Sequence, residues 1–245
     1  NGMKMSDKMI ISEDHYIDMK KWMQVYIRDK CIFHLGDNWE IDGRKDKSFI
    51  PAYHNRNADP LGKCYEWQFY LRRGCFDSTF NSLLSQMFIY QVERKIGHFN
   101  FQLTGLETAA TPMLSAIPLV ARNFDIELNS FVVRKDRKEY GLLNWIEGEI
   151  KASTPVLIID DLISGGNSMK ECNNVLTLDH ANIETMDYVF AIINKYTKHM
   201  GNEHYRNKDR FEGFGNTSTM YCDKIPGKKI MYLFDCDDFF DFTVY

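Results

Sequence analysis

The middle of the chain alternates between stretches with helical spacing of apolar residues and short runs that are apolar almost throughout. Apolar residues recur three and four positions apart over residues 80–96, which predicts a long helix packed against a core. The runs "FNFQL", "LNSFVV", "PVLIID" and "MDYVFAIIN" predict strands, and two helical patterns, residues 109–121 and 168–176, lie between them. Apolar strands that take turns with helices are typical of parallel sheets buried on both faces. The sequence therefore predicts an α/β fold with an open, mainly parallel, twisted sheet and helices on both faces.

The N-terminal part departs from this alternation. Ser12 is followed by acidic residues and then by apolar residues on one helical face, which predicts an amphipathic helix over residues 12–31. Residues 35–63 lose all periodicity and are rich in Gly, Asp, Asn and Arg, so we interpret them as an irregular or hairpin-containing insertion. We interpret its aromatic residues as core or dimer contacts rather than as a stacking surface for a base: Trp39, Phe49 and Tyr53.

The C-terminal part is polar over residues 195–229 and then becomes apolar and aromatic, with four aspartates in the last stretch. The D-x-D-D spacing there lacks the glycine and the glutamate of a calcium loop, so an edge strand or a docking tail is the better interpretation. We divide the chain into three parts: a small hood of N-terminal helix and insertion (1–66), the α/β core (67–195) and a C-terminal extension that packs on the core (196–245).

Composition narrows the classes of protein. A chain of 245 residues with 44% hydrophobic residues is globular and long enough to bury a core. The net charge of −4 gives no indication of a nucleic-acid partner. There is no run of eighteen apolar residues and no apolar segment in "NGMKMSDKM", so we expect a cytoplasmic protein without a membrane segment. The six cysteines form no C-x-x-C pair, which indicates reduced, buried thiols rather than a zinc site.

The segment "VLIIDDLISGGNSM" (residues 156–169) combines a buried strand, two adjacent acids and a loop of small residues before a helix. We expect the strand to end at Ile159, which puts Asp160 and Asp161 at its tip. A small-residue loop at a helix N-terminus offers backbone N–H groups and a favourable dipole to a phosphate. The two carboxylates then face hydroxyl groups or a metal ion beside that phosphate, and a ribose 5-phosphate provides both. The alternative, in which the acids only cap a turn, leaves the loop and helix unexplained.

This segment resembles the signature of the type I phosphoribosyltransferases, which consists of an apolar strand, two acids and a Thr/Ser/Gly loop. Asn167 stands where the family usually has glycine, and asparagine tolerates left-handed backbone better than most residues. A nucleotide-binding loop of the Walker type does not fit, because no Gly-Lys-Ser/Thr follows. The resemblance implies the family's α/β fold and a site for 5-phosphoribosyl 1-diphosphate.

Two further segments are similar to orotate phosphoribosyltransferases within this family. "FQLTGLETAATPMLSAIPL" resembles their diphosphate-binding turn, with Ala110 in place of a glycine. "FVVRKDRKEYGLLNWIEG" resembles their flexible loop, with Tyr140 at the position of a histidine. A plain strand-to-helix turn and a solvated charged loop are the alternatives, and the second does not explain the trailing "IEG".

A fourth segment, "FYLRRGCFDS", resembles the N-terminal hairpin of that family, with Arg72 at its lysine position. Cys75 and Phe76 replace the residues that follow the glycine, and Arg72 and Arg73 also fit a surface pair. The four segments together span a little over half of the chain.

The resemblance implies transfer of phosphoribose to a nucleobase nitrogen with release of pyrophosphate and with Mg²⁺ as cofactor. Orotate is the first candidate for the accepting base. Asp160 and Asp161 would hold the ribose hydroxyls and, through them or through water, the metal. Lys135 and Lys138 would neutralise the leaving diphosphate, and the loop that carries them would be shared across a homodimer. The remaining implied contacts to phosphoribosyl diphosphate are Ser164, Gly165, Gly166, Asn167, Ser168, Thr108, Ala109, Ala110, Arg134 and Arg72.

Two alternatives stay open at this point. One is a transferase with another acceptor, because the altered hairpin and the insertion lie where the family builds its base pocket. The other is a regulator or effector that binds phosphoribosyl diphosphate without transferring it. The retained cations of the flexible loop favour an enzyme, whereas Tyr140, Ala110 and Cys75 weigh against an enzyme.

Overall fold

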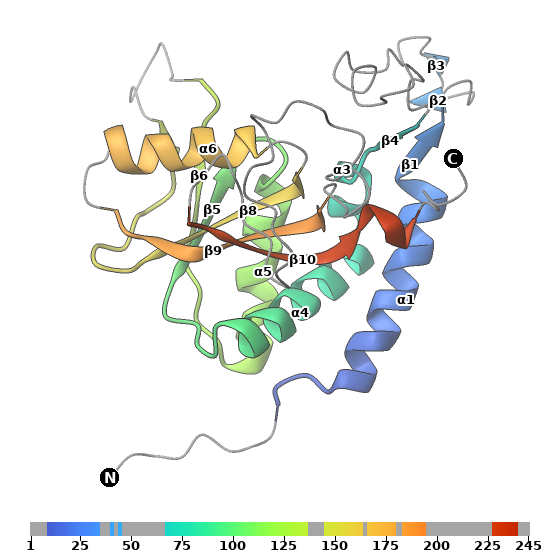
Figure 1. The fold of residues 1–245 in the computed structure, drawn as a ribbon, viewed down its shortest axis with the longest axis horizontal. Coiled ribbons are helices and arrows are strands. Elements are labelled where there is room, and N and C mark those ends of the chain that lie inside the picture. The colour runs from blue at the N-terminus through green and yellow to red at the C-terminus, as the bar shows by residue number, and fades with distance from the viewer. Residues whose placement is uncertain are drawn as a thin grey trace.

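The computed structural model describes residues 9–34, 40–41, 44–45, 67–136, 145–163, 166–179, 183–194 and 227–239 (Figure 1). Several residues singled out above lie outside these ranges: Trp39, Phe49, Tyr53, Lys138, Tyr140, Ser164 and Gly165, together with Asp241, one of the four aspartates in the last stretch.

A six-stranded sheet with the order β10-β9-β8-β5-β6-β7 forms the centre of the described part of the chain. All neighbours pair in parallel except β6 and β7, which pair antiparallel. This confirms the predicted mainly parallel α/β sheet. Its strands are β5 (Gln102–Leu106), β6 (Ser130–Val133), β7 (Ile146–Glu147), β8 (Val156–Ile163), β9 (Thr185–Asn194) and β10 (Lys229–Asp235).

Helices cover both faces of this sheet (Figure 1). On one face lie α4 (Ser78–Lys95) and α5 (Thr111–Ala121), and on the other lies α6 (Asn167–Asn174), which continues into the π-helical turn Val175–Asp179. Alternate residues of the strands join two separate hydrophobic clusters, one under each layer of helices. The apolar strands therefore follow from burial on both sides.

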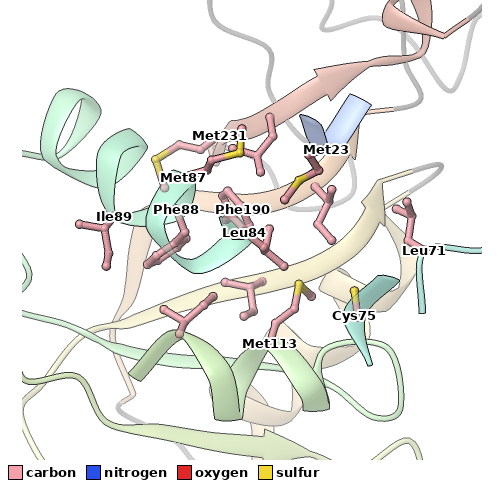
Figure 2. Packing of buried hydrophobic residues seen from close by; sticks show 14 of the residues in the cluster. Met23, Leu71, Cys75, Leu84, Met87, Phe88, Ile89, Met113, Phe190 and Met231 are labelled. Atoms are coloured by element: carbon pink, nitrogen blue, oxygen red, sulfur yellow. The ribbon is translucent and has the colours of Figure 1, made fainter. Parts of the chain in front are cut away.

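The larger cluster joins α4 and α5 to the strands (Figure 2). Phe88 of α4 meets Phe190 of β9 edge to face, with ring centroids 4.9 Å apart. Met87, Met113 and Met231 belong to the same cluster from α4, α5 and β10, and all three are fully buried. Flexible methionine side chains suit a core formed between helices and a sheet.

The N-terminal helix α1 (Glu13–Lys30) packs against α4, as its amphipathic pattern predicted. Ser12 caps it by accepting a hydrogen bond from the N–H of His15. Met19, Met23 and Ile27 form its buried stripe, with a spacing of four residues. The helix leads into β1 (Ile32–His34), which pairs antiparallel with β4 (Trp67–Phe69).

The remaining elements are short. In the insertion, β2 (Glu40–Ile41) pairs with β3 (Arg44–Lys45), which agrees with the hairpin interpretation. Arg122–Phe124 and Cys236–Asp238 form 3-10 turns after α5 and β10, and Arg72–Cys75 forms the short helix α3. No helix of the described residues is both long and apolar enough to cross a lipid bilayer.

Strand β5 begins three residues later than the predicted run "FNFQL". Its polar residues are paired within the fold rather than exposed: the amide of Gln102 donates to the carbonyls of Lys151 and Thr154, and the hydroxyl of Thr104 donates to the carbonyl of Phe131. A strand whose polar side chains bond to neighbouring backbone carries no apolar pattern, so periodicity placed it too early.

Strand β10 confirms the edge strand expected after residue 229. It pairs in parallel with β9, and Met231, Leu233 and Phe234 are buried. The turn after it is joined to α1, where the amide of Gln24 donates to the carbonyl of Asp238 at 2.6 Å. This stretch of the C-terminal extension thus completes the core sheet, while the division of the chain at residues 66 and 195 stays a prediction.

Candidate functional site

Asp160 and Asp161 lie inside the central strand β8. The prediction that this strand ends at Ile159 is wrong, because it continues to Ile163 and pairs with β9 throughout, for example Asp160 with Ala191. On its other side, the last pair with β5 is Ile158 with Thr104. The ladder to β9 supports the strand past the point where β5 leaves it, so the acids stand at the open carboxyl edge of the sheet.

The carboxyl group of Asp160 is buried, with only 6% of the residue exposed. It hydrogen bonds to Ser168 at the start of α6, and its Oδ1 accepts the N–H of Asp161 at 2.9 Å. Burial, and then the charge of Asp161, raise the pKa of Asp160 well above its ordinary value. In the absence of a bound cation, Asp160 therefore keeps a proton into the range where a solvated aspartate has lost it.

Asp161 has different neighbours. Burial raises the pKa of Asp161, while the hydrogen bond with Asp160 and the positive charge of Arg72 act in the opposite direction. The two carboxyl groups are therefore close enough for each to affect the pKa of the other. A divalent cation or the hydroxyl groups of a sugar would favour the ionised pair, because each supplies positive charge or hydrogen-bond donors.

Two buried thiols surround the acid pair, a feature that the sequence did not reveal. Cys75 of α3 is close enough to Asp161 for the carboxylate's charge to raise the thiol's pKa, after burial, which is the larger cause. Cys172 of α6 stands in the same relation to Asp160 and hydrogen bonds to Thr104 of β5. Neither thiol is a nucleophile in this setting, because burial in apolar surroundings disfavours the thiolate.

Helix α6, which begins at Asn167, is the next element in the chain after β8. Gly166 adopts left-handed backbone with φ 70° at the N-cap position, and no side chain of the described residues caps the helix there. Asn167 is exposed and Ser168 is half-buried, so both are accessible at the first turn. Uncapped N–H groups beside a left-handed glycine form a concavity suited to a phosphate.

The turn between β5 and α5 is packed against β8. Gly105 lies so close to the carbonyl of Ile159 and the methyl group of Ala110 that a Cβ on it would overlap both. Ala110 is buried, Ala109 is half-buried and Thr108 is exposed. The peptide bond between Glu107 and Thr108 is cis. The turn therefore presents its residues at the same edge as the acid pair.

The start of the charged loop is bound to this turn. The N–H of Lys135 donates to Glu107 Oε1 at 3.0 Å. The Nη1 atom of Arg134 lies 3.8 Å from Glu107 Oε2 and 3.4 Å from Glu147 Oε1, so two carboxylates share one guanidinium. Lys135 itself is exposed. The sequence pattern contained both glutamates, but not their contact with Arg134.

Arg72 lies on a helix instead of on a strand or hairpin. The strand β4 covers only Trp67–Phe69, and the N–H of Cys75 donates to the carbonyl of Leu71 in a helical turn. The guanidinium of Arg72 lies 5.2 Å from the centroid of the Tyr70 ring. The segment thus brings Cys75 close to Asp161, while Arg72 remains exposed.

The structure therefore gathers Asp160, Asp161, Ser168, Arg72 and the turn that contains Gly105 around one point of the sheet edge. Lys135 and Arg134 adjoin that turn through Glu107. Within the described ranges, no three His, Cys, Asp or Glu side chains come together as a metal site. Oxygen donors are nonetheless present in the acid pair, and Mg²⁺ takes few protein ligands and keeps waters or substrate oxygens for the rest. The acid pair fits that partial donor set.

Similar proteins among curated sequences are orotate phosphoribosyltransferases. The chain is 33% identical over 92 residues to that of Rhodopirellula baltica, which is 37% of this chain and 46% of the relative. It is 27% identical over 105 residues to that of Methanocaldococcus jannaschii, covering 42% of this chain and 54% of the relative. The chain spans about half the length of these curated relatives. No protein-family model matches it.

Solved structures agree over a larger part of the chain. An orotate phosphoribosyltransferase of Mycobacterium tuberculosis in complex with Fe(III) dicitrate has a TM-score of 0.58 at 17% identity, covering 90% of this chain and 98% of that one. A phosphoribosyltransferase of Corynebacterium diphtheriae has the same TM-score and identity, with 91% and 98% covered. The chain therefore has the type I phosphoribosyltransferase fold, and its resemblance to orotate phosphoribosyltransferases is confirmed.

Proposed function

We propose that this protein is a phosphoribosyltransferase that binds 5-phosphoribosyl 1-diphosphate with Mg²⁺ and transfers phosphoribose to a nucleobase nitrogen, with orotate as the first candidate for the acceptor. The observation that carries the proposal is the buried acid pair Asp160 and Asp161 at the open edge of β8, beside the uncapped start of α6. Similarity to curated orotate phosphoribosyltransferases supports it independently. Burial raises the pKa of both carboxyl groups, and perturbed pKa values of this kind cluster at sites that bind a ligand.

In the proposed complex, Asp160 and Asp161 would accept hydrogen bonds from the ribose hydroxyls and would hold the metal through those hydroxyls or through water. The bound Mg²⁺ would neutralise charge on the diphosphate oxygens. The backbone of Gly166 and Asn167, the hydroxyl of Ser168, and the neighbouring Ser164 and Gly165 would bind the 5-phosphate. Burial of the acids makes their interaction with a partly positive sugar stronger than it would be in water.

In the transfer step, the bond from the base nitrogen to C1 forms while the bond from C1 to the diphosphate oxygen breaks. That oxygen keeps both bonding electrons, and the proton of the nitrogen passes to solvent. Negative charge grows on the leaving diphosphate, where Thr108, Ala109 and Ala110 would approach it by backbone, and where Lys135 and Lys138 would neutralise it. Arg72 would lie on the side of Asp161, next to the ribose and the acceptor.

We further propose a cytoplasmic homodimer in which the charged loop of one subunit serves the site of the other. The resemblance to the family is the support for both statements. The segment that holds Arg72 and Cys75 differs from the family's hairpin, which supports a changed acceptor as the second candidate. A regulator that binds phosphoribosyl diphosphate without transferring it is the third candidate, and an experiment has to distinguish it from the two transferases.

The test is to mix the protein with phosphoribosyl diphosphate, Mg²⁺ and a panel of nucleobases, and to measure pyrophosphate release. Release that depends on orotate is the expected result. Release with another base alone would replace the acceptor and keep the reaction. Binding without release from any base would refute the transferase and leave a regulator, and absence of binding would refute the whole proposal.

A further inference from the structure

The turn between β5 and α5 and the charged loop are joined by one carboxylate. Glu107 accepts the N–H of Lys135 at 3.0 Å through Oε1, and its Oε2 lies 3.8 Å from Nη1 of Arg134. The N–H of Glu107 itself donates to the carbonyl of Val133, the last residue of β6. Backbone and side chain of Glu107 thus hold three consecutive residues at the point where the loop leaves the sheet.

The far end of the loop is held by the same guanidinium. Arg134 Nη1 lies 3.4 Å from Oε1 of Glu147, and the N–H of Arg134 donates to the carbonyl of Trp145 at 2.8 Å. The side chain of Arg134 is only 25% exposed, so these contacts are partly shielded from water. Residues 137–144 between the two ends lie outside the described ranges.

We propose that Glu107 is a positioning residue: it fixes the backbone of Lys135, and through Arg134 both ends of the charged loop, relative to the turn that approaches the diphosphate. The inference rests on the proposed function and adds a role to a residue that the site itself does not use. The backbone of Lys135 is fixed by Glu107 of the same chain. The role therefore holds for whichever site of a dimer the lysine side chain serves.

Charge alone makes the opposite prediction for Glu107. A carboxylate beside a diphosphate site repels the ligand, so its removal would tighten binding of phosphoribosyl diphosphate and leave turnover unchanged. A positioning role lowers turnover instead, because the loop cations then miss the charge that develops in the transition state. The ratio of the effects on kcat and on KM separates the two roles.

The experiment compares Glu107→Ala, Glu107→Gln and the control Glu149→Gln with the wild type. Glutamine keeps an oxygen that accepts the N–H of Lys135, whereas alanine removes both contacts. Glu149 is an exposed glutamate just beyond β7 and changes the net charge equally. We expect kcat of Glu107→Ala to fall at least roughly tenfold with KM changed less than about threefold, and Glu107→Gln to recover most of kcat. The control should remain within about twofold.

Hydrogen exchange of the Lys135 amide provides a readout without catalysis. It should accelerate at least about tenfold in Glu107→Ala and much less in Glu107→Gln. An unchanged kcat in Glu107→Ala, or a loss that glutamine does not recover, would overturn the positioning role in an active enzyme. Unchanged exchange would overturn the contact itself. A wild type that releases no pyrophosphate with any base would instead refute the proposed function, and exchange would still decide whether Glu107 holds the loop.

Discussion

A methyl group at position 105 would test how the diphosphate turn and the acid pair are joined. In Gly105→Ala the new Cβ would lie under 3.0 Å from the Cβ of Ala110 and from the carbonyl oxygen of Ile159, and 3.5 Å from the carbonyl carbon. Ordinary contacts begin at 3.4 Å, and neither neighbour is the end of a flexible side chain. Both therefore have to move, and Ile159 directly precedes Asp160.

Overpacking of this kind typically costs about 1–3 kcal/mol, and two rigid neighbours place the substitution near about 3 kcal/mol. A chain of this size loses about 2–4 °C of Tm per kcal/mol, so we expect a fall of about 6–12 °C. The displacement also separates the turn from the acids, and a misplacement of about 1 Å lowers catalytic efficiency on the order of a hundredfold.

Gly97→Ala is the matched control. Gly97 follows α4 with φ +81°, and a Cβ there would meet nothing within 4 Å. Its cost is the left-handed backbone alone, about 1 kcal/mol or about 2–4 °C, with no change in catalysis. Thermal unfolding without ligand, followed by kinetics on both variants, completes the assay. Gly105→Ala as stable as the control would refute the tight junction, and full activity despite lost stability would refute its role in the site.

Asp160→Asn should be more stable than the wild type near neutral pH. Because the pKa of Asp160 is raised in the folded state, its contribution to wild-type stability is complete below the unfolded-state pKa and is lost as pH rises through the folded-state pKa. The difference in unfolding free energy between Asp160→Asn and the wild type should therefore vanish in acid. A constant difference at all pH values would contradict this. Lys135→Ala should lower kcat/KM by the equivalent of about two to four kcal/mol of transition-state stabilisation and leave Tm unchanged. Kinetic measurements would show this loss, whereas unchanged kinetics would exclude Lys135 from the site. Cys75 and Cys172 should resist alkylation until the protein unfolds, as mass spectrometry would show; rapid labelling of the folded protein would contradict their burial.

The fold was largely predictable because strands that are buried on both faces are apolar almost throughout. Strands β6, β8 and β9 were placed near their observed positions, and the capped pattern after Ser12 located α1. The strand β5 was shifted because Gln102 and Thr104 satisfy their polar groups inside the fold. Ile146–Glu147 forms β7 only because it pairs with β6. A stretch of two residues has no periodic pattern from which a strand could be predicted.

The site was predictable where its function requires local sequence and was not where it depends on contacts between distant segments. The acids and the small-residue loop are adjacent in the chain, so their pattern is readable. The contact of Glu107 with Lys135 joins residues 28 positions apart, and the approach of Cys75 to Asp161 joins more distant segments. The extension of β8 to Ile163 depends on its ladder with β9, a long-range property of the same kind.

The central claim is that Asp160 and Asp161 form the grip for a phosphoribosyl group. Calorimetric titration of phosphoribosyl diphosphate with Mg²⁺ into the wild type and into the double variant Asp160→Asn, Asp161→Asn tests it directly. The account predicts saturable binding to the wild type and none to the double variant. The double variant should unfold cooperatively at the wild-type temperature or above it, because neutral amides replace two buried ionisable carboxyl groups. A folded double variant that binds with wild-type affinity, or a wild type that binds nothing, would contradict it.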